Sequence, residues 1–265
     1  MTNDKQQHAI HDAARASAGD VRVSYLCQAN DRQTQEFFAA RKTQIKEAIR
    51  EAARSAGRNP DDVELLAVSK TLVGNDFCSA IKAGYRQFGE NRVHVLQERF
   101  AAIEACQASG LSFDLIGHLQ TNKARHVVGK VRLIHSVDSV HLAQKLNELA
   151  AAANVNQAIL LQVNLSHEES KSGFDEQELL ASLEILVNLK NIEIAGLMTM
   201  AMQGNLTKAQ RTFEACRNLR DVIQTEVGDA WNLATLSMGM SEDFIAAIQE
   251  GATIIRLGRT LFDRE

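Results

Sequence analysis

The chain has 265 residues, of which 45% are hydrophobic and 23% charged, and its formal net charge is −4 at pH 7. These values are ordinary for a soluble globular protein, and the length suits one large α/β domain or two small ones. No run of about 18 apolar residues is present, so we expect no membrane-spanning helix. The mild acidity and the absence of a basic cluster argue against nucleic acid as a partner.

The beginning of the chain, residues 1–33, is polar and shows no sustained periodicity, so we expect a flexible extension there. It contains no apolar stretch of the kind that a secretory signal needs, which favours a cytoplasmic location. The cysteines are widely spaced and form no CxxC pair, so we expect free thiols rather than a disulfide framework or a metal site. They are Cys27, Cys78, Cys106 and Cys216.

A helix is predicted over residues 34–56, because apolar residues recur there on one face and Gly57 supplies a stop. The chain then alternates between short apolar runs and helical segments. We predict strands at residues 64–69, 85–89, 112–117, 132–137, 158–165, 192–200, 234–237 and 253–257. We predict helices at residues 75–83, 92–108, from near 121, and at 138–153, 176–189, 207–225 and 241–249.

Eight strand–helix units joined by short loops are typical of a (β/α)₈ TIM barrel, so we expect residues 34–265 to form one such barrel. The alternative is an open doubly wound sheet. That fold seldom needs eight regularly spaced strands, and no GxGxxG motif follows the first strand. The helix ahead of the first strand would plug the amino-terminal end of the barrel or pack against its side.

The first predicted strand and its end, residues 64–71 (ELLAVSKT), carry the first candidate for chemistry. The apolar run indicates a strand buried on both faces, as in a parallel sheet. It ends in Lys70, at the end of the sheet where α/β barrels keep their sites. A lysine amine in that position can form a Schiff base with a carbonyl compound. The simpler interpretation is that Lys70 only marks the place where the strand meets water.

Polar residues follow the other predicted strands in the same way. They include Glu90, Asn91, His118, Gln120, Asn122, Lys123, Ser136, Asp138, Asn164 and Thr199. We expect Glu90 to be structural, and we expect His118 to be bonded to a neighbouring loop rather than to act as a base.

Two loops near the end of the chain are the most informative. After the seventh strand, Ser237-Met238-Gly239-Met240-Ser241 leads directly into a predicted helix, with Ser241 at the N-cap position. After the eighth strand, Arg256-Leu257-Gly258-Arg259-Thr260 offers a second turn of backbone donors. Helix N-termini bind phosphate, and TIM barrels often hold phosphate between these two loops. Either loop alone could be a simple helix cap or strand end; together with Lys70 they favour a ligand that carries a phosphate and a carbonyl group.

Seven motifs in chain order resemble those of the pyridoxal phosphate homeostasis proteins of the YggS/PROSC type. They are LAVSKT, FGEN, IGHLQTNK, IHSVD, GLMTM, LSMGMS and IRLGR, and the resemblance covers about residues 35–262. It implies a barrel of the alanine racemase N-terminal domain type, preceded by a helix. Two departures stand out: residues 1–33 are additional to the family pattern, and Asp263 occupies a position where the family pattern suggests glycine.

The resemblance also implies pyridoxal 5′-phosphate (PLP) as cofactor, held as an aldimine by Lys70. It implies phosphate contacts from the loops after strands 7 and 8, Arg256 beside the pyridine nitrogen, and Asn91 near the cofactor. The cofactor-binding residues that we predict are therefore Lys70, Asn91, Ser237, Met238, Gly239, Ser241, Arg256, Gly258 and Arg259.

Whether the protein is an enzyme is a separate question. A racemase on this fold needs a second base, normally a tyrosine, but the two tyrosines are Tyr25 in the extension and Tyr85 at the start of the second strand. An arginine at the ring nitrogen cannot give up its proton, so it leaves the pyridine a poor electron sink. We therefore expect a non-catalytic carrier that maintains the intracellular level of PLP. The alternatives are a PLP-dependent enzyme acting on amino acids, such as a weak racemase or lyase, and a Schiff-base aldolase. We expect a monomer, with PLP-dependent apoenzymes as candidate recipients.

Overall fold

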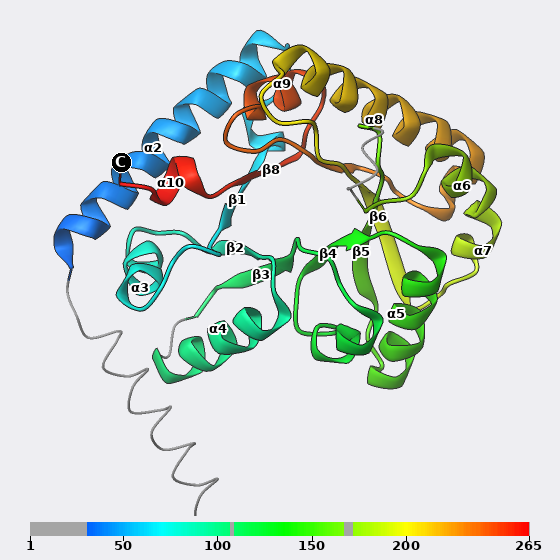
Figure 1. Cartoon of the computed structure of the whole chain (residues 1–265), viewed down its shortest axis with the longest axis horizontal. Coiled ribbons are helices and arrows are strands. Elements are labelled where there is room, and N and C mark those ends of the chain that lie inside the picture. Colours follow the sequence, from blue (N-terminus) through cyan, green and yellow to red (C-terminus); the bar gives the residue numbers. More distant parts are fainter. Residues whose placement is uncertain (1–30, 107–108, 167–171, 265) are drawn as a thin grey trace, which may run out of the picture.

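A closed barrel of eight parallel strands, surrounded by helices, is the architecture of the computed structural model (Figure 1), which describes residues 31–106, 109–166 and 172–264. Each strand pairs with its neighbour in sequence, and β8 closes the barrel on β1 with Glu64 opposite Ile254. The (β/α)₈ prediction is confirmed. The strands are β1 (Glu64–Val68), β2 (Gln87–Glu90), β3 (Ser112–Leu115), β4 (Leu133–Val137), β5 (Gln157–Gln162), β6 (Ile192–Met198), β7 (Thr235–Ser237) and β8 (Ile254–Leu257). The extension expected at residues 1–33 lies almost wholly outside the described residues.

The barrel interior contains a small apolar cluster of residues from five different strands, namely Leu66, Leu133, Leu160, Met198 and Ile254. Side chains of a strand alternate between its two faces, so residues two positions from this cluster also face inward. His135 on β4 and Arg256 on β8 are two such residues, and both are buried. The outward faces of the strands pack against the helices in a second, larger cluster. The interior of the barrel is therefore part apolar and part polar.

In the outer layer, the first helix precedes β1 and the other helices lie between or after the strands. The helices are α2 (Arg32–Ser55), α3 (Asn75–Lys82), α4 (Val93–Cys106), α5 (Val140–Ala153), α6 (Glu176–Ala181), α7 (Leu183–Val187), α8 (Leu206–Val227), α9 (Phe244–Gln249) and α10 (Arg259–Phe262), with 3₁₀ segments η1 (Pro60–Asp62), η2 (Thr121–His126) and η3 (Gly228–Ala230).

The first helix packs against the side of the barrel and does not plug its end. Helix α2 contacts α3, α9 and α10, and it runs along the outside of the barrel (Figure 1). Its Phe38 is fully buried and meets Phe262 of α10 edge-on at a ring distance of 5.1 Å. Because α10 has only four residues, α2 completes the helical layer between α9 and α3.

Two predicted helices differ from the structure for local reasons. The helix expected at residues 176–189 is divided into α6 and α7 at Ser182, whose hydroxyl donates to the carbonyl of Glu178 at 2.7 Å. Such back-bonding competes with the helical hydrogen bonds and bends the chain. The helix expected near Thr121 is instead the short 3₁₀ segment η2, which ends at His126, and Gly129, at a φ of 73°, turns the chain soon afterwards.

The prediction of free thiols is confirmed for Cys216, which is buried, and is wrong for Cys78, which is disulfide-bonded. Spacing along the chain says nothing about distance in the fold, so the pattern of cysteines could not reveal this bond. In the part of the chain that the structure describes, no helix is both long enough and apolar enough to cross a membrane.

Candidate functional site

A cavity of about 580 Å³ lies at the carboxyl-terminal ends of the strands. It brings together six of the predicted cofactor-binding residues, namely Lys70, Asn91, Ser241, Arg256, Gly258 and Arg259. They belong to segments that follow or end four different strands, which meet because the barrel is parallel and closed. Its volume falls within the range of small-molecule and cofactor pockets, about 300–1,000 Å³.

Lys70 is the first exposed residue after the buried end of β1. Its amine makes no hydrogen bond or ion pair with any described residue, so it is available to a ligand. The residue before it is fixed: the Ser69 hydroxyl donates to Oε1 of Glu90 at 2.7 Å, and both side chains are fully buried. Arg99 of α4 donates to the same Glu90 oxygen at 3.1 Å and to the carbonyl of Ser69 at 3.1 Å. The expectation that Glu90 is structural agrees with these contacts.

Asn91 borders the cavity at a point where the segments after β2 and β3 approach each other closely. A Cβ atom on Gly117, after β3, would lie 2.1 Å from the carbonyl oxygen of Asn91, so only glycine fits at position 117. Both residues border the cavity.

The two predicted phosphate loops are in contact with each other. The backbone N–H of Thr260 donates to the Ser241 hydroxyl at 3.5 Å, and Arg259 forms an ion pair with Glu242 at 2.7 Å. Ser241 is not the N-cap that the sequence suggested, because α9 begins only at Phe244. Asp243 instead accepts from the backbone N–H of Met240 at 2.6 Å and closes a turn ahead of the helix.

Three predicted site residues lie beneath the cavity wall rather than on it. Ser237 and Met238 are fully buried. Gly239 has a φ of 95°, and a Cβ atom there would lie 2.6 Å from Cβ of Ala247 in α9. This glycine permits a close approach of the loop to a helix of the protein, and its predicted role toward a ligand remains a prediction.

Arg256 lies between the barrel interior and the cavity. Its Nη1 donates to the Ser237 hydroxyl at 2.7 Å and its Nη2 to the carbonyl of Thr199 at 3.0 Å. Among the described residues no carboxylate lies within ion-pair distance of it, and its Nε donates to none of their atoms. Burial lowers the pKa of Arg256 to about 10, which leaves the guanidinium charged at neutral pH.

His118 borders the cavity and pairs with Asp138 after β4, with Nδ1 3.0 Å from Oδ2. This agrees with the expected bond to a neighbouring loop. The side chain of His118 is 60% exposed, whereas that of Asp138 is only 13% exposed. The carboxylate can therefore orient the imidazole toward the cavity mouth.

Sequence reasoning missed part of the cavity wall. Gln162 ends β5 and donates to the carbonyl of Ser172 at 2.7 Å, and both residues border the cavity together with Gln203. The apolar run predicts a strand end at residue 165 and a site residue at Asn164, whereas β5 ends at Gln162 and Asn164 does not border the cavity. The signal was weak, since Gln162 is one polar residue inside a long apolar run.

The donor set matches a ligand that carries an aldehyde, a phosphate and a ring nitrogen. Lys70 supplies an amine that has no ion-pair partner in the described part of the chain. Arg256 supplies a charged donor held by neutral groups, and Ser241 supplies a hydroxyl at the cavity that Gly258 also borders. A Cβ atom at Gly258 would lie 3.2 Å from the carbonyl oxygen of Val68. The loop after β8 therefore lies directly against the end of the strand that carries Lys70. The residues present fit PLP.

Comparisons with known proteins agree with this donor set. The family model of the alanine racemase N-terminal domain matches residues 40–264. The chain is 39% identical over 223 residues to a pyridoxal phosphate homeostasis protein of Aquifex aeolicus, covering 84% of this chain and 96% of the relative. It is 41% identical over 215 residues to the protein of that name in Pseudomonas aeruginosa, covering 81% and 90%.

Among solved structures, the chain is similar to PipY of Synechococcus elongatus PCC7942 with PLP bound. The identity is 37%, the TM-score is 0.73, and the match covers 85% of this chain and 99% of PipY. The matched segment and the identities show the family: the chain belongs to the alanine racemase N-terminal domain family and, within it, to the pyridoxal phosphate homeostasis proteins.

Proposed function

We propose that this protein binds PLP in the cavity at the carboxyl-terminal end of the barrel, through an imine bond to Lys70, and thereby maintains the level of free PLP. The observation that carries the proposal is the position of Lys70. Its amine, which is unpaired among the residues that the structure describes, borders the same cavity as Arg256 and the loops after β7 and β8. The names of the relatives and the PLP bound to PipY support the same ligand.

Each residue has a separate part in this proposal. Lys70 forms the covalent bond, Arg256 donates to the ring nitrogen, and the segments around Ser241 and Gly258 hold the phosphate. Free PLP is a reactive aldehyde and an electron sink for amino-acid chemistry. A protein that binds it covalently and reversibly can limit its free concentration and release it to apoenzymes.

The contacts of Arg256 and Tyr85 favour a carrier over an enzyme. Arg256 is a permanent donor, which keeps a ring nitrogen unprotonated and weakens the electron sink. Tyr85 is buried, and its hydroxyl donates to the carbonyl of Phe38 in α2 at 3.1 Å. Among the described residues no tyrosine borders the cavity. The proposal also includes a cytoplasmic location, a monomeric state and one PLP-binding barrel over residues 34–265.

The His118–Asp138 pair supports the alternative, a PLP-dependent enzyme acting on amino acids. It is an acid–base pair at the cavity. Purified, PLP-loaded protein separates the two proposals when it is assayed with alanine and serine. A carrier gives no turnover at the rate of an ordinary metabolic enzyme. Turnover that is lost in His118→Asn would promote the alternative.

The covalent bond is tested by the absorbance spectrum of the purified protein and by borohydride reduction. We expect a yellow protein in which borohydride fixes the cofactor on the peptide containing Lys70. Lys70→Ala should lose the adduct. Lys123→Ala, which removes another exposed lysine that follows a strand end, should keep it. An adduct on a different lysine, or none after PLP is added, would contradict the proposal. An aldolase would be colourless as purified. Sedimentation at several protein concentrations tests the monomeric state.

A further inference from the structure

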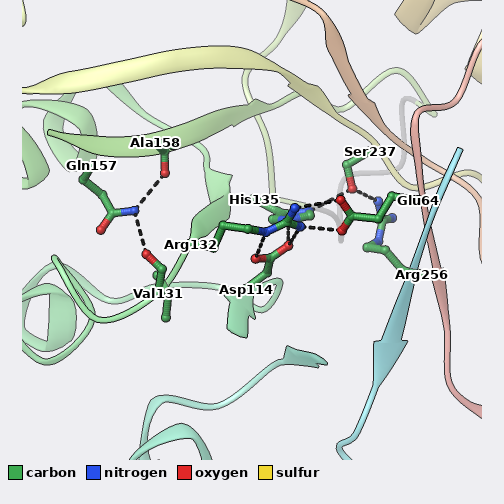
Figure 2. Close-up of polar contacts among 9 residues, drawn as sticks. All are labelled: Glu64, Asp114, Val131, Arg132, His135, Gln157, Ala158, Ser237 and Arg256. Carbon is green, nitrogen blue, oxygen red and sulfur yellow. Dashed lines mark hydrogen bonds and ion pairs between the residues drawn. The ribbon is translucent and has the colours of Figure 1, made fainter. Parts of the chain in front are cut away.

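A chain of polar side chains crosses the interior of the barrel and ends at Arg256 (Figure 2). It begins at the amino-terminal end of the strands, where Arg132 donates to Glu64 at 2.7 Å and to Asp114 at 2.9 Å. It continues through His135, whose Nε2 lies 3.0 Å from Asp114 and whose Nδ1 lies 2.8 Å from the Ser237 hydroxyl. The last link is the 2.7 Å bond from Arg256 to the same hydroxyl.

The direction of each hydrogen bond in this chain follows from the chemistry of its donors. A guanidinium can only donate, so the Ser237 oxygen accepts from Arg256. The Asp114 carboxylate can only accept, so Nε2 of His135 carries the hydrogen and donates to it. In the neutral imidazole Nδ1 then presents a lone pair, and the Ser237 hydroxyl donates its proton there.

The surroundings of His135 agree with a neutral imidazole in this tautomer. Burial lowers the pKa of His135, against the attraction of Asp114, and the cations Arg256 and Arg132 lower it further. Burial alone would raise the pKa of Asp114, but hydrogen bonds from Arg132 and His135 outweigh it and keep that pKa below its ordinary value. Asp114 remains an acceptor, and each polar side-chain atom of Asp114, His135 and Ser237 has a partner of the correct kind.

The contacts of Arg256 indicate the role of this series of hydrogen-bonded side chains. Two of its nitrogens are held by Ser237 and by the carbonyl of Thr199, and both acceptors are neutral. Two bonds fix the plane of the guanidinium, and neither neutralises its charge. Its Nε is left without a partner among the described residues, at a residue that borders the cavity. A carboxylate in place of Ser237 would fix the side chain equally well but would cancel the charge.

We propose that His135 and Ser237 are positioning residues that hold Arg256 in place as a donor to the bound cofactor. His135 accepts the Ser237 proton and so keeps the Ser237 lone pair directed at Arg256. This inference rests on the proposed function in one respect, the presence of PLP in the cavity. The state of Arg256 itself can be measured without PLP.

Four variants are compared with the wild type to test the proposal, and part of the comparison uses protein without PLP. His135→Asn keeps an acceptor near the position of Nδ1, His135→Leu removes it, and Ser237→Ala removes the bridging hydroxyl. Gln157→Met is the matched control, because Gln157 is a buried amide of β5 that donates to the carbonyls of Val131 and Ala158 and takes no part in this network (Figure 2).

The first measurement is the ¹⁵N order parameter of the Arg256 Nε–H in protein without PLP. We expect a rigid value of about 0.85 in the wild type, in His135→Asn and in Gln157→Met, and a flexible value below about 0.6 in His135→Leu and Ser237→Ala. The second is the imidazole ¹⁵N spectrum of the wild type, which should show the Nε2–H tautomer of His135. The third is the affinity for PLP, measured by absorbance titration. This affinity should fall about tenfold in His135→Leu and Ser237→Ala and should stay at the wild-type value in His135→Asn.

A double-mutant cycle separates positioning from a general effect on the fold. In an Arg256→Gln background, His135→Leu should change PLP affinity less than twofold, because the residue through which it acts is gone. An Nδ1–H tautomer in the wild type, or a rigid Arg256 in both disruptive variants, overturns the proposal. The proposal is also overturned if Gln157→Met loses as much PLP affinity as His135→Leu and Ser237→Ala. If His135→Leu does not fold, the proposal is still tested by the tautomer of His135 in the wild type and by the order parameter and PLP affinity of His135→Asn and Ser237→Ala. A wild type that binds no PLP refutes the proposed function alone, since the order parameters and the tautomer test the positioning.

Discussion

The Ser69 hydroxyl donates to the buried carboxylate of Glu90 at 2.7 Å, one residue before the lysine that we propose as the PLP anchor. Arg99 binds the same carboxylate, and its guanidinium lies 4.2 Å from the centre of the Phe77 ring. The second oxygen of Glu90 is buried and has no hydrogen-bond partner among the residues that the structure describes. This carboxylate therefore depends on Arg99 for its charge compensation, and it connects α4 to the end of β1.

Glu90→Gln should lower the free energy of unfolding by about 2–4 kcal/mol, because it removes one member of a buried ion pair and leaves Arg99 uncompensated. Urea denaturation of the protein without PLP measures this. Glu98→Gln on the exposed face of α4 is the matched control and should change stability by less than about 0.5 kcal/mol. Retention of PLP should also fall in Glu90→Gln, since Ser69 loses its carboxylate partner. Equal stability of the two variants would show that the pair contributes nothing.

Gly239→Ala should destabilise the protein far more than Gly204→Ala. Both glycines have a positive φ, 95° and 76°, but a Cβ atom at position 239 would collide with Ala247 at 2.6 Å, whereas position 204 is open. Gly204→Ala should cost about 1–2 kcal/mol through backbone strain alone. Gly239→Ala should cost at least about 3 kcal/mol, because the loop after β7 must also move. Equal losses in urea denaturation would mean that the collision is relieved without cost.

The stability of the protein should fall as the pH decreases below about 6.5, the ordinary pKa of histidine. Burial lowers the pKa of His135 in the folded state, so below that pH the unfolded chain binds a proton that the folded protein does not. One such proton contributes a slope of up to about 1.4 kcal/mol per pH unit, which ends when the pH reaches the folded pKa. The groups facing His135 are Asp114, Arg132 and Arg256.

Urea denaturation without PLP between pH 7 and pH 5 measures this slope. His135→Asn should reduce it, whereas His94→Asn, on the exposed part of α4, controls for loss of a histidine from the surface. An unchanged slope in His135→Asn would show that His135 does not take up the proton on unfolding.

The barrel and most of the cavity could be predicted from sequence for one physical reason. Carboxyl ends of parallel strands meet at the same end of a closed sheet, so any polar residue just after a buried run is brought there. Lys70, Asn91 and Arg259 were found in this way although they are far apart in the chain. This reasoning needs only the strand ends, and short apolar runs mark them well.

The same reasoning could not find the series of polar side chains that crosses the barrel interior, and it placed Ser241 wrongly as a helix N-cap. All five residues of β4 are buried, so the apolar pattern does not reveal that His135 faces inward. Its partners lie on other strands, and their pairing depends on strand register. Helix α9 begins later than predicted because the Ser241 hydroxyl accepts from the backbone N–H of Thr260 in the neighbouring loop, and Asp243 closes a turn on the backbone N–H of Met240. Ser and Asp both suit such turns, and composition alone does not choose between them.

Arg256→Glu is the sharpest test of the ring-nitrogen contact. It replaces a donor to neutral pyridine with an acceptor that favours pyridinium. A charge-assisted hydrogen bond of that kind contributes about 1.5–3 kcal/mol, enough to raise the pKa of the ring nitrogen by about one unit or more. The bound cofactor should become a better electron sink, and slow transamination of amino acids should increase.

Arg256→Gln is the matched control, because it also removes the two guanidinium bonds to Ser237 and Thr199 but brings no carboxylate. Arg256→Gln should lose about 1–3 kcal/mol of stability, since a buried carbonyl loses its donor, and Arg256→Glu should lose more in protein without PLP, because its buried carboxylate has no cation beside it among the described residues. Only the glutamate variant should gain reactivity, and titration of the bound cofactor's absorbance should show the raised pKa. If the two variants lose PLP and stability together and neither gains reactivity, Arg256 only supports the loop. An unchanged ring-nitrogen pKa in a folded, PLP-loaded Arg256→Glu protein would refute the contact directly.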